Sequence, residues 1–177
     1  MLEQLKTFFG RRKFLFAGII LIGTLFTLDI YTKRLAFSQV EYIQQKTAGV
    51  HSHIYINDYL NIVKVVNTGI SFGMFRHLQN GQLILSAITL AIILFVFYLL
   101  YKTRITYRMF TYSLIIAGGL GNIYDRILFG GVFDFLDFHY KQYHWPAFNI
   151  ADSIICIGVF LLVFEDLIFM LIRKNNI

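Results

Sequence analysis

The sequence predicts an all-α membrane protein in which four transmembrane helices carry a small β-rich cap, placed between the first and second helices on the extracytoplasmic side. Composition is the first reason. Of the 177 residues, 57% are hydrophobic, 18% are aromatic and 15% are charged, and the mean hydropathy is +0.63. A soluble domain seldom has this composition. The chain contains one Pro and no low-complexity linker, so residues 1–177 are expected to form one domain.

Four apolar runs are the second reason. A helix crosses a hydrocarbon core of roughly 30 Å with about 20 residues. The approximate spans are 14–32, 83–101, 109–124 and 152–172. The second run carries no charge, whereas the fourth contains Glu165 and Asp166. We expect these two acids to lie near the inner boundary and to pair with nearby Lys or Arg.

The distribution of basic residues predicts the orientation. Nine of the sixteen Lys and Arg residues lie in the two termini and in the connection after the second span: Lys6, Arg11, Arg12, Lys13, Lys102, Arg104, Arg108, Arg173 and Lys174. Such residues are retained on the cytoplasmic side. Both termini are therefore expected inside, and residues 29–82 and 125–149 outside. The net charge of +6 thus reflects topology first and attraction to anionic lipid second, and it does not indicate a nucleic-acid partner.

The N-terminal run imitates a secretory signal, because a basic start is followed by apolar residues from Phe14. No small-x-small cleavage site follows Leu28, so we expect an uncleaved first span. Cys156 is the only cysteine and falls within the fourth span. It excludes an intramolecular disulfide and is expected to be a small apolar packing residue.

The first outer segment is expected to contain short strands. Between residues 54 and 75, Tyr, Ile and Val are interrupted by turn signals such as Asn57-Asp58 and Asn67-Thr68-Gly69. This pattern is typical of strands joined by tight turns. A small sheet on the membrane surface would either grip an extended peptide or form a plain cap.

Polar residues gather in the second outer segment and at its edges, in the clusters 121–126, 133–135, 145–149 and 151–152. Ionisable groups beside hydrocarbon are costly to desolvate, so these clusters indicate a functional site. Two adjacent carboxylates that share a proton can activate a water and protonate a departing amine. Asp134 precedes a predicted loop and Asp152 opens the fourth span, so a return through Trp145-Pro146 would allow them to meet. We therefore predict an intramembrane hydrolase.

At these residues the chain resembles the lipoprotein signal peptidases, the type II signal peptidases of bacteria. The matching blocks stand in order as Asp29 with Lys33, Asn67-Thr68-Gly69-Ile70-Ser71-Phe72-Gly73, Gly118-Gly119-Leu120-Gly121-Asn122-Ile123-Tyr124-Asp125-Arg126, Val132-Phe133-Asp134-Phe135 and Phe148-Asn149-Ile150-Ala151-Asp152. The resemblance covers most of the chain. It implies a four-span aspartyl endopeptidase that cuts a lipid-modified precursor just before its diacylglyceryl cysteine.

The resemblance also implies the roles of individual residues. Asp134 and Asp152 would be the catalytic pair. The supporting or substrate-binding residues would be Asp29, Lys33, Asn67, Gly69, Asn122, Asp125, Arg126, Asn149 and Ala151. The protein would be a monomer of the bacterial cytoplasmic (inner) membrane with its active site near the outer face. Its partners would be the prolipoprotein and membrane lipid, and it would need neither a cofactor nor a metal.

Some of these residues can also be explained by purely structural roles. Asp125 and Arg126 are expected to form a structural ion pair at the end of the third helix rather than to act directly in catalysis. Asn122 and Asn149 would either satisfy buried backbone groups or orient carboxylates.

The glycines at positions 118, 119 and 121 are expected to be close-packing positions, because the lysine of a phosphate-binding loop is missing. Asp137 follows Asp134 by one helical turn and is its main competitor for the role of the first catalytic carboxylate. The family blocks favour Asp134.

Other chemistries fit the sequence less well. Nothing fixes the geometry of a Ser-Lys dyad built from Ser71 or Ser153 with Lys33. Four histidines of the outer segments lack the His-Glu-x-x-His spacing of a zinc protease and are expected to be solvated loop residues: His51, His53, His139 and His144. A proton- or cation-coupled carrier would place its carboxylates near the bilayer midplane, whereas here they cluster at one boundary. A non-catalytic assembly protein would leave the paired aspartates unexplained.

Overall fold

The structure is a computed structural model, and it describes residues 2–69 and 80–175. Within these residues the elements follow one another as α1 (Leu2–Lys46), β1 (His53–Asn57), β2 (Leu60–Asn67), α2 (Gly81–Lys102), α3 (Thr106–Phe129), β3 (Val132–Tyr140), β4 (Tyr143–His144) and α4 (Ile150–Asn175). The predictions that concern Ser71 and the block residues 70–73 lie outside the described residues.

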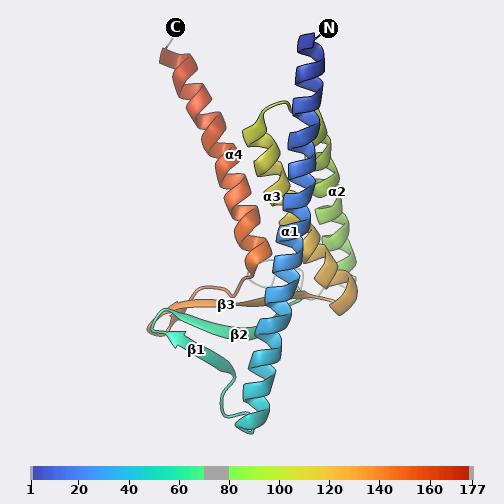
Figure 1. Ribbon diagram of the computed structural model, residues 1–177. Helices are drawn as coiled ribbons and strands as arrows, with labels where there is room; N and C mark the ends of the chain where they lie inside the picture. Colours follow the sequence, from blue (N-terminus) through green and yellow to red (C-terminus); the bar gives the residue numbers. More distant parts are fainter. Residues whose placement is uncertain (1, 70–79, 176–177) are drawn as a thin grey trace.

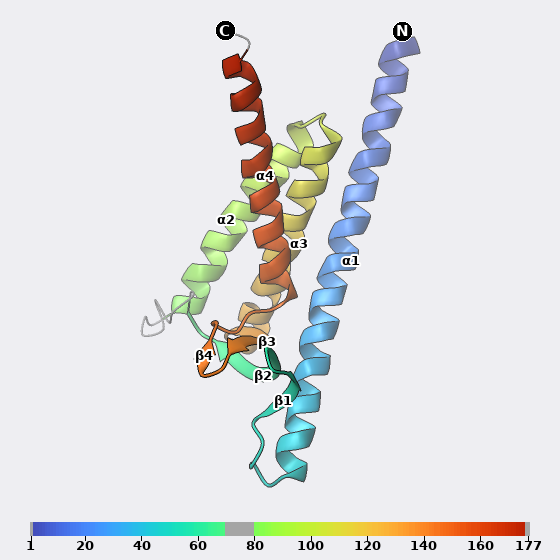
Figure 2. The ribbon, with the colours of Figure 1, turned by 90° about the vertical axis from the view of Figure 1, so that its left-hand side faces the viewer.

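The helices run along one another, and the small sheet lies across one end of them (Figures 1 and 2). Both termini and the α2–α3 connection lie at the opposite end. Among the described residues, two helical stretches are long and apolar enough to cross a membrane, Phe14–Lys46 and Gly81–Lys102. Their surfaces expose large apolar side chains such as Phe16 and Phe95. Apolar surface of this extent is typical of contact with lipid.

α1 is longer than the predicted span. Its 45 residues correspond to roughly 68 Å, about twice the thickness of a hydrocarbon core. The helix continues past residue 32 because residues 33–46 contain no Gly or Pro that would end it. This extension runs along the sheet (Figure 1). Ala36, Phe37 and Val40 are buried on it, and the first two pack against Phe135 of β3.

α3 is the central helix of the molecule. It contacts each of the other three helices, and residues 111–119 are all buried. A Cβ at Gly118 would overlap the carbonyl oxygen of Ala151 in α4, and a Cβ at Gly121 would overlap the Asp29 carboxylate of α1. α3 thus approaches its neighbours through bare backbone, as small residues allow between membrane helices. The packing role predicted for this glycine run is confirmed.

The strands form one antiparallel sheet in the order β1-β2-β3-β4. β1 and β2 come from the segment between α1 and α2, as predicted, but β3 and β4 come from the segment between α3 and α4. The predicted position of the cap is therefore incomplete. A two-stranded ribbon is marginal by itself in water, and β3 completes it by pairing Val65 with Asp134 and Asn67 with Val132. Asp134 consequently lies inside a strand, and the loop expected after it begins only beyond Tyr140.

Two predictions about α4 have opposite outcomes. Near the end of the helices away from the sheet, Arg108 of α3 lies 2.9 Å from Glu165 and 2.9 Å from Asp166. The pairing predicted for these acids is confirmed. Cys156 is exposed, because it faces a cavity beside the sheet. The packing role predicted for it is wrong.

Candidate active site

The first turn of α4 forms one side of a polar site. The Oδ1 atom of Asn149 accepts the backbone N–H of Asp152 at 2.9 Å, and the Oδ2 atom of Asp152 accepts the backbone N–H of Asn149 at 3.4 Å. This reciprocal arrangement is a capping box in which Asn and Asp replace Ser and Glu. It holds the Asp152 carboxylate at the positive end of the helix dipole.

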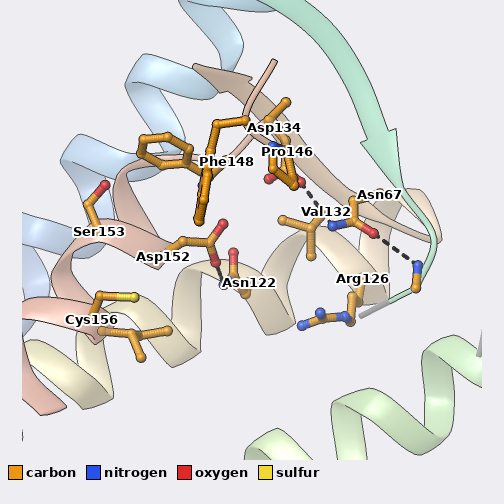
Figure 3. A pocket seen from close by; sticks show the side chains of 14 residues that line it. Asn67, Asn122, Arg126, Val132, Asp134, Pro146, Phe148, Asp152, Ser153 and Cys156 are labelled. Atoms are coloured by element: carbon orange, nitrogen blue, oxygen red, sulfur yellow. Dashed lines mark hydrogen bonds between the residues drawn. The ribbon is translucent and has the colours of Figure 1, made fainter. Parts of the chain in front are cut away.

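Asp134 reaches the same site from β3. The amide of Asn149 donates to its Oδ1 atom at 2.7 Å, and the amide of Asn67 donates to its Oδ2 atom at 3.0 Å. Asn67 pairs with Val132 at the end of β2, so the antiparallel register places its side chain diagonally across from Asp134. Because Asn149 contacts both carboxylates, strand and helix bring Asp134 and Asp152 to one place (Figure 3).

A buried lysine supports the pair from α1. Lys33 is 1% exposed, and its Nζ atom lies 2.7 Å from Asp29 and 2.8 Å from Asp125. It also donates to the Oδ1 atom of Asn122 at 3.3 Å. An ammonium group can only donate hydrogen bonds, so it fixes the direction of the Asn122 amide. The nitrogen of that amide then donates to Asp152 at 2.8 Å.

The two carboxylates beside Lys33 also bind backbone groups. Asp29 accepts the N–H of Ala151, in the first turn of α4, at 2.8 Å. Asp125 accepts the N–H of Phe133, in β3, at 3.2 Å. Buried charges need partners of both kinds, since their desolvation is otherwise costly. The network therefore fixes the start of α4 and the start of β3 against α1 and α3.

Asp134 and Asp152 line a cavity of about 550 Å³. The remaining lining residues are Asn67, Gly69, Asn122, Arg126, Val132, Trp145, Pro146, Ala147, Phe148, Ser153, Ile155 and Cys156. Arg126 comes from the last turns of α3 and lines the same cavity as the carboxylates (Figure 3). Its buried Nε atom has no hydrogen-bond partner among the described residues. The cavity thus combines two carboxylates, one guanidinium and an apolar wall.

The protonation of Asp134 is unusual. Burial, and then repulsion by Asp152, raise the pKa of Asp134 to about 7, against the opposing effects of the Asn67 and Asn149 hydrogen bonds and of the Lys33 charge. The Asp134 residue is only 1% exposed, and its hydrogen-bond donors are neutral amides, so its ionised form is poorly compensated. A carboxyl group with this pKa can hold a proton near neutral pH and still exchange it in a reaction.

The structure places all the predicted site residues in this cavity or in the network beneath it. One predicted contact is wrong, because Asp125 forms its ion pair with Lys33, while Arg126 lines the cavity. The two interpretations left open for Asn122 and Asn149 are both partly right, since each orients a carboxylate and Asn149 also caps a helix. Nor does Lys33 pair with Ser153, whose hydroxyl donates to the Asn149 carbonyl at 3.0 Å.

Asp137 occupies the other face of the sheet, because residues three apart on a strand point in opposite directions. Its Oδ1 atom lies 2.8 Å from Nδ1 of His144, and its Oδ2 atom accepts from Asn61 at 3.1 Å. His139 stacks on His144 with ring centroids 5.1 Å apart. The helical spacing assumed for Asp137 is therefore wrong. The histidines at 53, 139 and 144 lie on strands rather than in loops.

The sequence did not reveal the apolar wall of the cavity. Residues 145–149 were counted among the clusters that indicate a functional site, but Trp145-Pro146 was assigned only as the return between the two carboxylates. Residues 145–148 line the cavity because the Trp145 N–H donates to the Phe138 carbonyl at 2.8 Å, while Phe148 and Leu136 exchange backbone hydrogen bonds at 2.9 and 3.1 Å. A usable signal was present, since Trp and Phe in an otherwise polar segment indicate a surface that contacts a ligand or lipid.

Apolar helices with a polar, carboxylate-lined cavity at one end define a membrane enzyme as the class of this protein. A family model described as signal peptidase (SPase) II matches residues 21–168. The chain therefore belongs to the signal peptidase II family, which is a family of proteases.

Individual relatives agree with this assignment. A lipoprotein signal peptidase of Thermodesulfovibrio yellowstonii is 43% identical over 141 residues, which are 80% of this chain and 93% of the relative. One of Anaplasma phagocytophilum is 36% identical over 150 residues, which are 85% and 91% of the two chains. A bacterial membrane enzyme solved by the in meso method at 2.3 Å resolution is similar with a TM-score of 0.68 and 30% identity, over 85% of this chain and 87% of that one.

Proposed function

We propose that this protein is an intramembrane aspartyl endopeptidase that removes signal peptides from diacylglyceryl-modified prolipoproteins by cutting before the lipidated cysteine. One observation carries the catalytic part: Asn149 holds Asp134 and Asp152 together on the wall of a partly apolar cavity. The family match and the names of the relatives support the class of substrate.

In the proposed reaction, Asp134 carries the shared proton and Asp152 is ionised. Asp152 removes a proton from a water whose oxygen attacks the scissile carbonyl carbon, while Asp134 gives its proton to the carbonyl oxygen. When the C–N bond breaks, Asp152 protonates the departing amine and one hydroxyl of the tetrahedral intermediate returns a proton to Asp134. The raised pKa of Asp134 and the position of Asp152 at a helix N-terminus support this division of roles.

The supporting residues are proposed to act at different distances from the scissile peptide bond. Arg126, with its unpartnered Nε atom, is proposed to bind a carbonyl of the substrate. Asn67 orients Asp134, and the Gly69 N–H fixes Asn67 by donating to its Oδ1 atom at 3.0 Å. The network of Lys33, Asp29, Asp125 and the Ala151 N–H positions the pair without touching the substrate.

All four helices are proposed to span the bacterial cytoplasmic membrane, with the sheet and the cavity at the outer face. α3 and α4 contain 24 and 26 residues, roughly 36 and 39 Å, which is enough to cross the core. The charge distribution of the connections supports this orientation. The chain is proposed to act as a single-domain monomer without a cofactor.

Labelling of single cysteines tests this orientation. In a Cys156→Ala background, substitutions of Asn57 and Gln142 should react with a membrane-impermeant reagent added to intact cells. A substitution of Thr103, between α2 and α3, should react only after permeabilisation. The reverse pattern would place the cavity on the cytoplasmic side and would reject the proposed topology.

The proposal of a carrier is weaker. A carrier would need its carboxylates near the bilayer midplane. Asp134 lies in a strand at one end of the helices, and Asp152 lies in the first turn of α4 next to the same sheet. The pair is thus placed to meet a substrate at the membrane boundary, which favours hydrolysis over transport.

The test of the function compares one precursor with and without the diacylglyceryl group on its cysteine, at equal concentration in the same detergent. Each buried methylene contributes about 0.8 kcal/mol, so two acyl chains anchor the cysteine and provide binding energy for positioning the bond. We expect the lipidated precursor to be cut before its cysteine and the other to be cut poorly or not at all. Equal rates would reject recognition through the lipid.

A further inference from the structure

A second cavity lies on the face of the sheet opposite the carboxylate pair. Val132 and Asp134 line the first cavity, whereas their neighbour Phe133 lines the second, as alternation along a strand requires. The second cavity, called here the α1 groove, has a volume of about 650 Å³ and lies between the extension of α1, β2 and the end of α3. It shares no lining residue with the first cavity.

The floor of the α1 groove is aromatic. Phe37 stacks on Phe133 with centroids 4.3 Å apart, and Phe133 stacks on Phe129 at 4.7 Å. Phe129 is 46% exposed at the end of α3, next to the exposed Ile127 and Leu128. The floor therefore ends at an exposed phenylalanine in the last turn of α3, a turn whose exposed side chains Ile127 and Leu128 are also apolar.

The walls of the groove carry two cations and one anion. Arg34 is exposed, and its guanidinium donates to the Tyr124 hydroxyl at 2.9 Å. It forms no ion pair with a carboxylate among the described residues. Lys64 pairs with Glu41 and lies 5.6 Å from the centre of the Phe37 ring. The described lining residues thus carry a net charge of +1 beside an apolar floor.

The height of the groove places these charges at the membrane boundary. Arg34 follows Lys33, which lies 2.7 Å from Asp29, and the Asp29 carboxylate accepts an N–H from the first turn of α4. Arg34 is therefore level with the end of the helical part, and Lys64 stands beyond it on the sheet. In the proposed topology this level is that of the lipid head groups of the outer leaflet.

We propose that the α1 groove binds an anionic phospholipid, with its phosphate between Arg34 and Lys64 and an acyl chain along Phe129. This inference rests on the proposed topology but not on the proposed reaction. Charge favours the phosphate, since a cation near an anionic membrane surface contributes about 1 kcal/mol. The apolar floor distinguishes a lipid from a free anion, because a free phosphate would gain nothing from the phenylalanine stack.

The test measures lipid binding directly in the purified full-length protein. Native mass spectrometry in detergent would count bound phosphatidylglycerol, with phosphatidylcholine and inorganic phosphate as parallel probes. We expect saturable binding of phosphatidylglycerol, weaker binding of phosphatidylcholine and no competition by inorganic phosphate at millimolar concentration. Arg34→Gln and Lys64→Gln should each weaken the phosphatidylglycerol affinity about fivefold, and the double variant should weaken it further.

Lys141→Gln is the matched control, because Lys141 is an exposed cation of the same cap and also lies near an aromatic ring, 5.5 Å from the centre of Tyr140. It should bind phosphatidylglycerol as the wild type does, and Arg34→Lys should keep most of the affinity. Unchanged binding in the double variant, equal binding of the two lipids, or an equal loss in Lys141→Gln would overturn the inference. Displacement by inorganic phosphate would show a free-anion site instead. Because cleavage is not the readout, failure of the proposed function would not affect this result.

Discussion

Asp134 and Asp137 lie three residues apart on the same strand, are both buried, and have different surroundings. Asp137 has an imidazole nitrogen 2.8 Å from one carboxylate oxygen and an amide donor to the other, so both oxygens have partners within the sheet. Asp134 has two neutral amide donors and a second carboxylate beside it. The first arrangement satisfies a buried acid, while the second leaves it with a proton that it can exchange.

The charged groups of the interior have partners of opposite charge, whereas among the described residues the carboxylate pair at the cavity does not. In the interior, the ammonium of Lys33 is shared by two carboxylates. Hydrogen bonds to the amide oxygens of Asn122 and Asn149 fix the direction of these two side chains. At the cavity, the same amides present donors to a pair of acids that no described cation contacts within ion-pair distance. A rigid, satisfied network thus supports a pair that is itself electrostatically strained, as functional sites commonly are.

The largest expected effect separates the two acids by activity. Asp134→Asn and Asp152→Asn should each lower cleavage of a lipidated precursor by on the order of 10³-fold or more, because each removes a group that is proposed to transfer a proton. Asp137→Asn should stay within about threefold of the wild type. A dead Asp137→Asn enzyme beside an active Asp134→Asn enzyme would reverse the assignment of the two faces.

The next effect compares a buried ion pair with an exposed one. Lys33→Met leaves Asp29 and Asp125 without their shared cation, so the free energy of unfolding should fall by about 3–5 kcal/mol. Lys64→Met removes a partner of the exposed Glu41, and its cost should be below about 1 kcal/mol. Denaturation of both variants in the same detergent measures the difference, and equal costs would mean that the network does not stabilise the junction of α1, α3 and α4.

A third prediction uses the raised pKa of Asp134. Its folded-state value of about 7 exceeds the usual value near 4 for an unfolded aspartate. The free energy of unfolding of the wild type should therefore fall relative to that of Asp134→Asn by on the order of a few kcal/mol as the pH rises from about 4 to about 7. Above this range the difference between the two free energies should stay constant. Thermal unfolding of both proteins from pH 4 to 9 checks this. A difference that does not change with pH would show that Asp134 is ionised in the folded protein at all these values.

The smallest effect concerns the apolar wall. His144 precedes the wall residues 145–148 and is held by Asp137. His144→Gln should loosen the wall and raise KM by about twofold to threefold, with kcat nearly unchanged, because the wall lines the cavity and is proposed to contact the substrate but not the reacting atoms. Steady-state kinetics with the lipidated precursor measure both constants. A fall in kcat with an unchanged KM would instead connect His144 to the chemical step.

The two faces of β3 also show what a sequence can predict. The helices followed from apolar runs, and the grouping of Asp134 with Asp152 followed from the polar blocks at their ends. The partners of single residues did not follow, because they depend on pairing between distant segments. Asp125 was paired with its sequence neighbour Arg126, whereas its partner Lys33 comes from a helix that reaches it only after folding.

The strand itself was the main element missed. Val-Phe-Asp-Phe-Leu-Asp-Phe follows a glycine pair and is rich in Phe, which favours a strand. Its two Asp residues stand three apart instead of alternating with apolar residues, so hydrophobic periodicity did not reveal the strand. Reading it as a loop edge placed Asp137 one helical turn from Asp134 and hence on the same side. The register of β2 with β3 reverses that conclusion, because a strand sends the two side chains to opposite faces.

Asp134 and Asp152 are proposed to share one proton, which Asp134 holds near neutral pH. The pH dependence of kcat/KM for the lipidated precursor tests it most directly. We predict an activity that falls about tenfold per pH unit above roughly pH 7, where the pair loses its proton, and that also falls at low pH, where both acids are protonated. Activity that stays constant or continues to rise between pH 7 and 9 would contradict the claim.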